Sequence, residues 1–386
     1  MQMEGLLNFI TWVIAFWVVL MIIGKMFPSL EKHGLFIGPF YAIWKTTRLN
    51  PIFTKVAMKW RIAWKVLFDI GIALGIGQMI FAYYWLLKNL LAFLKATGEA
   101  SPVYPVIPGL TIGLETIKYF VPAILVIFIT HEFAHGIAAR MSGVRIRSVG
   151  ALAAFLVFAA FVEPDEQELK QLSVRDKLRM FSAGSMANLA TALLIIGIIS
   201  VLFLATPQGV LVMGTLKGYP AEGKVPPYSV IVALNETEIT SIRDLAAYLS
   251  QTKPGDVVVI RFVDPDGMLR GVRLKLAPNP ENKSRGFLGV RIVNYMPTRI
   301  RMSPLASLEL LNLLSWIQML CLSAAVLNML PIYPFDGGRV IFTLIDMKLS
   351  GKGARDLVKG VIMGTALLLL VLNMALSMFK FPLIPI

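Results

Sequence analysis

Long apolar stretches alternate with short polar segments along most of the chain. A transmembrane helix needs about 20 mostly apolar residues, and several stretches meet this requirement. They are residues 6–27, 64–90, 117–138, 181–205, 308–330 and 357–379. The pattern therefore predicts an α-helical polytopic membrane protein with about six transmembrane helices.

Residues 207–300 break this pattern with polar positions, turn signals and short runs typical of strands. Strands are expected at 209–213, 230–234, 257–263 and 272–276, and an amphipathic helix at 241–249. A segment of about 90 residues is long enough to fold alone. We therefore predict an inserted soluble α+β domain at 207–300, between membrane parts at 1–206 and 301–386.

One further apolar run, at residues 149–162, is too short to span and is followed at once by Glu163. Both of its ends must then lie on the same side of the membrane. Non-helical backbone at membrane depth survives only where protein or a cavity covers it. The run predicts a re-entrant hairpin or a buried strand pair, and an interfacial segment without a functional role is the alternative.

The composition agrees with a membrane protein. Apolar residues make up 56% and charged residues 16% of the 386 positions, whereas soluble domains have roughly 45–50% and about 25%. The net charge of +14 is better explained by basic cytoplasmic loops than by nucleic-acid binding. The single cysteine, Cys321, excludes an intramolecular disulfide and a zinc site built from cysteines.

Basic residues in the loops predict the orientation of the spans. Residues 25–65 contain eight Lys or Arg, residues 140–180 contain seven and residues 338–356 contain four, whereas residues 96–117 contain none. The positive-inside rule places the three basic loops in the cytoplasm and both termini outside. The soluble domain is then extracytoplasmic.

No cleavable signal peptide is expected at the N-terminus. Glu4 stands where a signal peptide has a basic region, and no small-residue cleavage site follows the first apolar stretch. This stretch is therefore interpreted as the first span of an integral membrane protein.

The strongest chemical signal is His131-Glu-Phe-Ala-His135 at the cytoplasmic end of the third predicted span. Two histidines four residues apart project from one helix face, where neutral imidazoles can bind zinc. Glu132 lies beside them as a general base that can take a proton from water. Ionisable groups inside a span are costly and are usually functional, so we predict one zinc ion per site.

Two histidines leave catalytic zinc short of a third protein ligand. The other histidine, His33, lies far from this span, so a carboxylate is expected. Asp336 is the best candidate, because nearby prolines interrupt a span and two glycines follow the acid. The rival acids are Asp69, Glu163 and Asp165.

The fourth predicted span opens with small residues around Gly184, which permit close helix contact, and with the amide Asn188. Asn188 is expected either to donate a hydrogen bond to the substrate or its oxyanion, or to join two helices. Gly184 is assigned to substrate binding on the same grounds.

Three ordered motifs together resemble the site-2 protease family of zinc intramembrane metalloproteases. They are His131-Glu-Phe-Ala-His135-Gly, Phe181-Ser-Ala-Gly-Ser-Met-Ala-Asn188 and Asn328-Met-Leu-Pro-Ile-Tyr-Pro-Phe-Asp-Gly-Gly338. The resemblance implies His131, His135 and Asp336 as zinc ligands, Glu132 as the base and Asn188 as a catalytic residue. It also implies a substrate-binding role for Asn328, and substrate held extended against the hairpin at 149–162.

Residues 207–300 are similar to PDZ domains of the bacterial type, through Tyr228–Ile239 and Arg285–Val290. Ser229 and Glu236 depart from that pattern. The resemblance implies a domain that binds a peptide or a C-terminus by strand addition, or one that only excludes bulky substrates. It favours a prokaryotic cell membrane.

These observations lead to one predicted function and its rivals. The chain is expected to hydrolyse a peptide bond in or near the transmembrane segment of a single-span membrane protein, in regulated intramembrane proteolysis. The alternatives are another membrane zinc peptidase, such as a protease of prenylated proteins, and a non-catalytic membrane scaffold or metal transporter. The expected partners are these substrates and the lipid bilayer.

Overall fold

The computed structural model of the chain describes residues 2–155 and 157–381. The chain divides into two compact units. One comprises Met1–Leu193 and Trp316–Ile386, and the other Leu194–Ser315. The second unit is wider than the soluble domain predicted at 207–300, because the ends of two long helices group with it. The first unit contains the candidate site.

Six long helices account for the predicted spans. They are α1 (Gln2–Met26), α4 (Arg61–Leu94), α5 (Ile117–Met141), α7 (Val174–Leu202), α9 (Pro304–Leu327) and α11 (Lys352–Lys380). Among the described residues, the last five are long and apolar enough to cross a membrane, and the first contributes a shorter apolar stretch, Val13–Met26. The chain is therefore a polytopic helical membrane protein. The shorter helices are α2 (Ser29–Lys32), α3 (Asn50–Lys59), η1 (Leu114–Thr116), α6 (Glu166–Gln171) and α10 (Asp336–Lys348).

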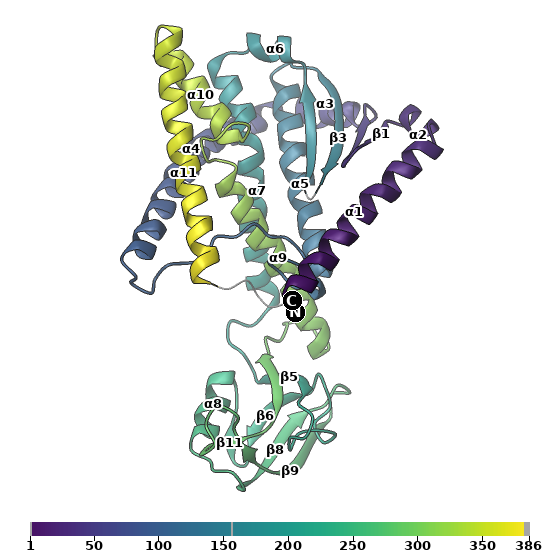
Figure 1. The fold of residues 1–386 in the computed structure, drawn as a ribbon, viewed down its shortest axis with the longest axis vertical. Helices are drawn as coiled ribbons and strands as arrows, with labels where there is room; N and C mark the ends of the chain where they lie inside the picture. The colour runs from purple at the N-terminus through teal and green to yellow at the C-terminus, as the bar shows by residue number, and fades with distance from the viewer. Residues whose placement is uncertain (1, 156, 382–386) are drawn as a thin grey trace. The chain divides into compact units, whose positions relative to one another are not determined.

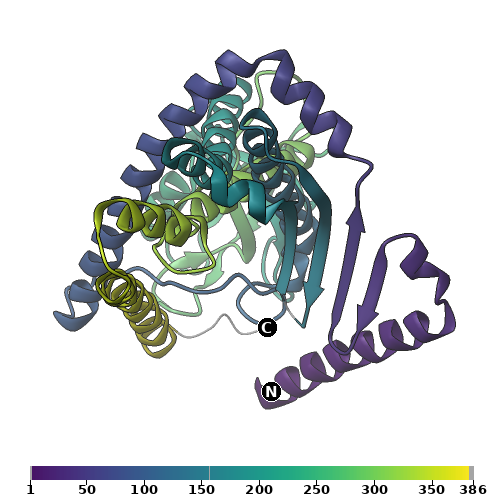
Figure 2. The ribbon, with the colours of Figure 1, turned by 90° about the horizontal axis from the view of Figure 1, so that it is seen from above.

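A four-stranded antiparallel sheet accompanies these helices. Its strands are β1 (Leu35–Gly38), β2 (Tyr41–Thr46), β3 (Ile146–Ala154) and β4 (Val157–Pro164), in that spatial order. The apolar run at 149–162 lies in the pair β3 and β4. Figure 2 shows this pair beside the strands β1 and β2, with α1 packed along β1. The hairpin β1–β2 was not predicted, because its short strands lie in a basic loop without strict alternation.

The strand β4 lies at one edge of this sheet. The strand β3 is hydrogen-bonded on both sides, to β2 and to β4, whereas β4 pairs only with β3 among the described strands. Helix α5 packs against β4. The sheet therefore presents a free strand edge next to the helix that contains the two histidines (Figure 1).

Close packing and one ion-pair cluster join α5, α7 and α4. The core contains the buried side chains of Phe53, Ile137, Ala183 and Met329. On α4, the carboxylate of Asp69 accepts hydrogen bonds of 2.6–3.0 Å from two arginines of α7, Arg175 and Arg179.

The second unit contains a sheet of order β12-β5-β6-β8-β9, with β7 paired to β6. Its elements are β5 (Val210–Thr215), β6 (Val230–Leu234), β7 (Thr237–Glu238), α8 (Ile242–Ser250), β8 (Val257–Val263), β9 (Leu269–Lys275), β10 (Ala277–Pro278), β11 (Gly286–Phe287) and β12 (Val290–Asn294). A capping box of Ser241 and Asp244 starts α8. Buried residues such as Ile231, Leu245 and Ile260 form the hydrophobic core of this second unit. The inserted domain is thus an α+β fold.

Candidate metal centre

Helix α5 brings the two histidines of the motif together. His131 and His135 lie one turn apart, and their Nε2 atoms are separated by 3.1 Å. His131 is 9% exposed. Helical geometry alone aligns the two side chains, since residues i and i+4 share a face.

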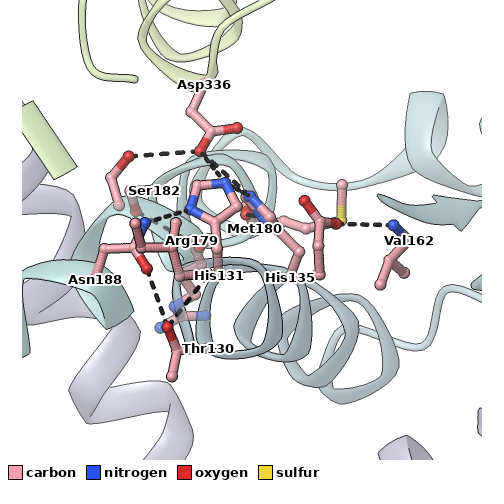
Figure 3. Close-up of polar contacts among 12 residues, drawn as sticks. Thr130, His131, His135, Val162, Arg179, Met180, Ser182, Asn188 and Asp336 are labelled. Carbon is pink, nitrogen blue, oxygen red and sulfur yellow. Dashed lines mark hydrogen bonds and ion pairs between the residues drawn. The ribbon is translucent and has the colours of Figure 1, made fainter. Parts of the chain in front are cut away.

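Asp336 approaches the same point from the first turn of α10. Its Oδ2 atom lies 3.3 Å from Nε2 of His131 and 3.2 Å from Nε2 of His135 (Figure 3). The backbone N–H of Gly337 donates to the carbonyl of Asn328 (2.8 Å), and a Cβ at Gly337 would collide with the backbone of Met329. A glycine after the acid is therefore required for the chain to fold back and place the carboxylate.

The three atoms fit a zinc ion. His131, His135 and Asp336 form a group able to hold a metal. Ligands about 2.0–2.1 Å from a tetrahedral zinc ion lie about 3.3–3.4 Å apart, close to the separations observed. Three lone pairs at such distances repel one another unless a cation lies between them, so the donor set suits a metal.

A backbone carbonyl orients His135. Its Nδ1 atom lies 2.7 Å from the carbonyl oxygen of Met180 on α7. Because a carbonyl only accepts, Nδ1 carries the proton and donates, and Nε2 keeps a free lone pair. Such a partner behind a ligating histidine fixes its tautomer and ring orientation.

Glu132 faces the same region but contacts none of the three ligand atoms. Its Oε2 atom accepts a hydrogen bond of 2.8 Å from the backbone N–H of Val162 in β4. The side chain is half-buried and lines the same cavity as the metal-binding group. The sheet therefore holds the carboxylate that sequence reasoning identified as the base.

A cavity of about 1010 Å³ opens onto these groups. Most of its lining is apolar, from α4, α5, β4 and α9, together with the segment Pro102–Val106. The cation in this lining is Arg339, whose guanidinium lies 5.8 Å from the ring centre of Phe181. The cavity thus offers apolar walls to a ligand and collects its charged groups at the metal centre.

The rival acids are used elsewhere. Asp69 pairs with the two arginines of α7. Glu163 accepts from Ser148 (2.6 Å). Asp165 caps α6, where the backbone N–H of Glu168 and the guanidinium of Arg147 hold the pKa of its carboxyl below the usual value. Of the four acids considered, Asp336 is the one that meets the histidines.

The remaining predicted residues divide into two groups. Asn328 lines the cavity. Gly184 and Asn188 are absent from its described lining. A Cβ at Gly184 would lie 2.5 Å from atoms of both imidazoles, so this glycine makes room for the metal ligands instead of facing the cavity.

Several contacts at the centre could not be predicted from the sequence. Thr130 contacts Asn188, the carbonyl of Met180 orients His135, and the N–H of Val162 holds Glu132. The two backbone contacts leave no mark on residue type. A polar threonine directly before the histidine motif, inside an apolar run, was the available signal for the first.

Comparison with known proteins adds a family to this geometry. The model of peptidase family M50 matches residues 119–372, which include all three motifs. The chain belongs to peptidase family M50. Peptidase family M50 is the site-2 protease family of membrane metallopeptidases, and His131, His135 and Asp336 are the candidate metal group of this chain.

Two curated proteins are similar to this M50 peptidase. The uncharacterized protein MJ0971 of Methanocaldococcus jannaschii is 26% identical over 62% of this chain and 57% of its own length. A membrane-bound transcription factor site-2 protease homolog of Arabidopsis thaliana is 24% identical over 57% of this chain and 39% of its own length. The chain thus spans less than two thirds of either relative.

Among solved structures, two similar chains are small PDZ domains. One from an SdrC-like protein of Listeria innocua is 18% identical, with a TM-score of 0.20, and covers 25% of this chain and 98% of that one. Its counterpart from Listeria monocytogenes is 22% identical, with a TM-score of 0.21, and covers 23% and 93%.

Proposed function

We propose that this M50 peptidase is a zinc endopeptidase that hydrolyses a peptide bond in or near the transmembrane segment of a single-span membrane protein. The observation that carries the proposal is the position of the metal group. Three ligand atoms 3.1–3.3 Å apart and a carboxylate open onto one cavity with mainly apolar walls, beside a free strand edge.

The metal group and Glu132 each have a role in this reaction. A zinc ion held by His131, His135 and Asp336 would supply Lewis-acid chemistry to a peptide carbonyl and to water. Glu132 takes the proton of the attacking water and returns it to the leaving amine. The N–H of Val162 fixes one oxygen of Glu132 and leaves the other for this transfer.

The free edge of β4 supports an extended substrate. The N–H of Val162 points away from β3, because it donates to Glu132. Successive backbone groups of a strand alternate in direction, so those of Ala160 and Phe158 face the same way as those of Val162. Both residues line the cavity. A substrate strand that pairs with them would carry its peptide bonds directly past Glu132.

Pairing with the edge of β4 would also replace the backbone hydrogen bonds that the substrate helix loses when it unwinds. The peptide bonds of a transmembrane helix are hydrogen-bonded within the helix and shielded. An unwound segment in lipid must find other partners for these groups, and the edge of β4 supplies them. The apolar walls receive the side chains.

The remaining parts of the proposal concern topology. The positive-inside pattern supports a cytoplasmic position for the metal centre and an extracytoplasmic position for the inserted domain. That domain would bind a peptide or screen bulky substrates before they reach the cavity. Asp336 as third ligand disfavours a protease of prenylated proteins, since that family resembles the chain only in its histidine motif.

Replacement of Glu132 tests the proposal. The full-length, zinc-loaded protein in detergent is incubated with a single-span substrate, and products are counted by mass spectrometry. Glu132→Gln is expected to bind zinc and to cleave about 10²–10⁴-fold more slowly. The matched control, Glu99→Gln, changes an exposed loop residue and should cleave normally. Cleavage by Glu132→Gln at the wild-type rate would show that the base is misassigned.

A further inference from the structure

Asn188 lies directly behind the first histidine and is fully buried. Its side chain is 0% exposed. The amide Nδ2 lies 3.2 Å from Nδ1 of His131, and the amide Oδ1 lies 3.0 Å from the hydroxyl of Thr130 (Figure 3). Neither atom reaches the cavity, so both are unavailable to a substrate or its oxyanion.

The proton on His131 decides how this amide can be used. A neutral imidazole carries one proton, and Nε2 must be bare to ligate a metal. The proton then resides on Nδ1, which becomes a donor. Its partner must be an acceptor, and an amide nitrogen cannot accept. Within the Asn188 side chain, only the amide oxygen can accept the hydrogen bond from Nδ1–H of a metal-ligating His131.

A half-turn of the Asn188 amide gives Nδ1–H of His131 an acceptor and keeps the contact with Thr130. Rotation by 180° about the Cβ–Cγ bond places Oδ1 against Nδ1–H of His131 and Nδ2 against the hydroxyl of Thr130. This hydroxyl has one proton, which it can donate to the carbonyl of Val126 at 2.9 Å. Its lone pairs then accept from Nδ2, so the oxygen and one N–H of the Asn188 amide each have a partner.

We propose that Asn188 is a positioning residue that selects the metal-binding tautomer of His131, with Thr130 anchoring its amide. The inference rests on the proposed metal site and replaces the oxyanion role expected from the sequence. Helix α7 then orients both ligating histidines through oxygen acceptors, the carbonyl of Met180 for His135 and the amide of Asn188 for His131.

Zinc affinity tests this role independently of proteolysis. The full-length protein and its variants are titrated with zinc against a competing chelator. Asn188→Leu keeps the volume but removes the acceptor, and it should bind zinc about 10–100-fold more weakly. Asn188→Asp restores an acceptor for Nδ1–H and should stay within a few-fold of the wild type.

A control on the same helix separates this role from packing. Ser182→Ala removes a buried hydroxyl that bonds only within α7, and its zinc affinity should be unchanged. Equal zinc affinity of Asn188→Leu and the wild type would overturn the proposal. So would equal losses in Asn188→Leu and Asn188→Asp, which would indicate a packing role. A wild-type protein that binds no zinc would instead refute the metal site itself.

Discussion

The metal-centre unit and the inserted domain are stabilised in different ways. The inserted domain has a core of alternating strand residues closed by a capped helix, as in many small soluble domains. In the metal-centre unit the exposed surface is itself apolar, and the few polar side chains at the centre each have a named partner. A buried polar group without a partner is costly, so the polar side chains gathered at the metal centre indicate function, whereas in the soluble domain many serve only turns and caps.

Loss of the carboxylate ligand should have the largest effect. Asp336→Ala leaves two histidines, which is too few for a catalytic zinc site. Zinc content should fall from about one per chain to near zero, with loss of cleavage, as measured by metal analysis of the purified protein. The inserted domain should keep its thermal transition. Full zinc content in this variant would mean that another residue supplies the third ligand.

A methyl group beside the metal-binding nitrogens of the two histidines should have the next largest effect. Gly184→Ala places a Cβ 2.5 Å from both imidazoles, which must shift or rotate. Zinc affinity should drop by at least about tenfold. Gly197→Ala on the same helix adds a Cβ in open space and provides the control. Unchanged affinity in Gly184→Ala would show that the histidines tolerate displacement.

A change at the edge of β4 should lower the rate of substrate cleavage and leave zinc binding unchanged. Ala160→Pro removes an outward N–H of β4, so the rate of cleavage should fall roughly tenfold while zinc content stays constant. Ala160→Val keeps the N–H and should cleave at nearly the wild-type rate. If Ala160→Pro cleaves as fast as Ala160→Val, the substrate does not pair with β4.

The smallest effect on the metal centre should come from the core of the inserted domain. Leu245 is 2% exposed, and Leu245→Ala should destabilise that domain by about 2–5 kcal/mol. Limited proteolysis of the full chain should show faster cutting within Leu194–Ser315. Zinc content should not change, and a parallel loss of zinc would mean that the two units are energetically coupled.

The two units also differ in what their sequences reveal. Apolar length predicted the long helices, and short β-type runs between turn signals predicted strands such as Val257–Val263. The strands β1 and β2 were missed, since a short strand in a basic loop has no distinctive pattern. Sequence periodicity is informative only where one face is buried and the other is wet.

At the metal centre, predictability depended on whether a contact is local. The spacing of His131 and His135 follows from helix geometry, and Asp336 followed from the need for a third ligand. The partnership of Asn188 with His131 and Thr130 joins two helices distant in sequence, and the support of Glu132 comes from a backbone amide. Neither contact has a signature in residue spacing.

The position of the cut bond is the most direct test of peptide hydrolysis within the membrane. The full-length, zinc-loaded enzyme is incubated with a single-span membrane protein, and both products are sequenced by mass spectrometry. We expect new termini in or near the apolar span of the substrate, formed by the wild type and lost in Glu132→Gln. Products cut only in a soluble domain of the substrate, or formed equally by the variant, would contradict it.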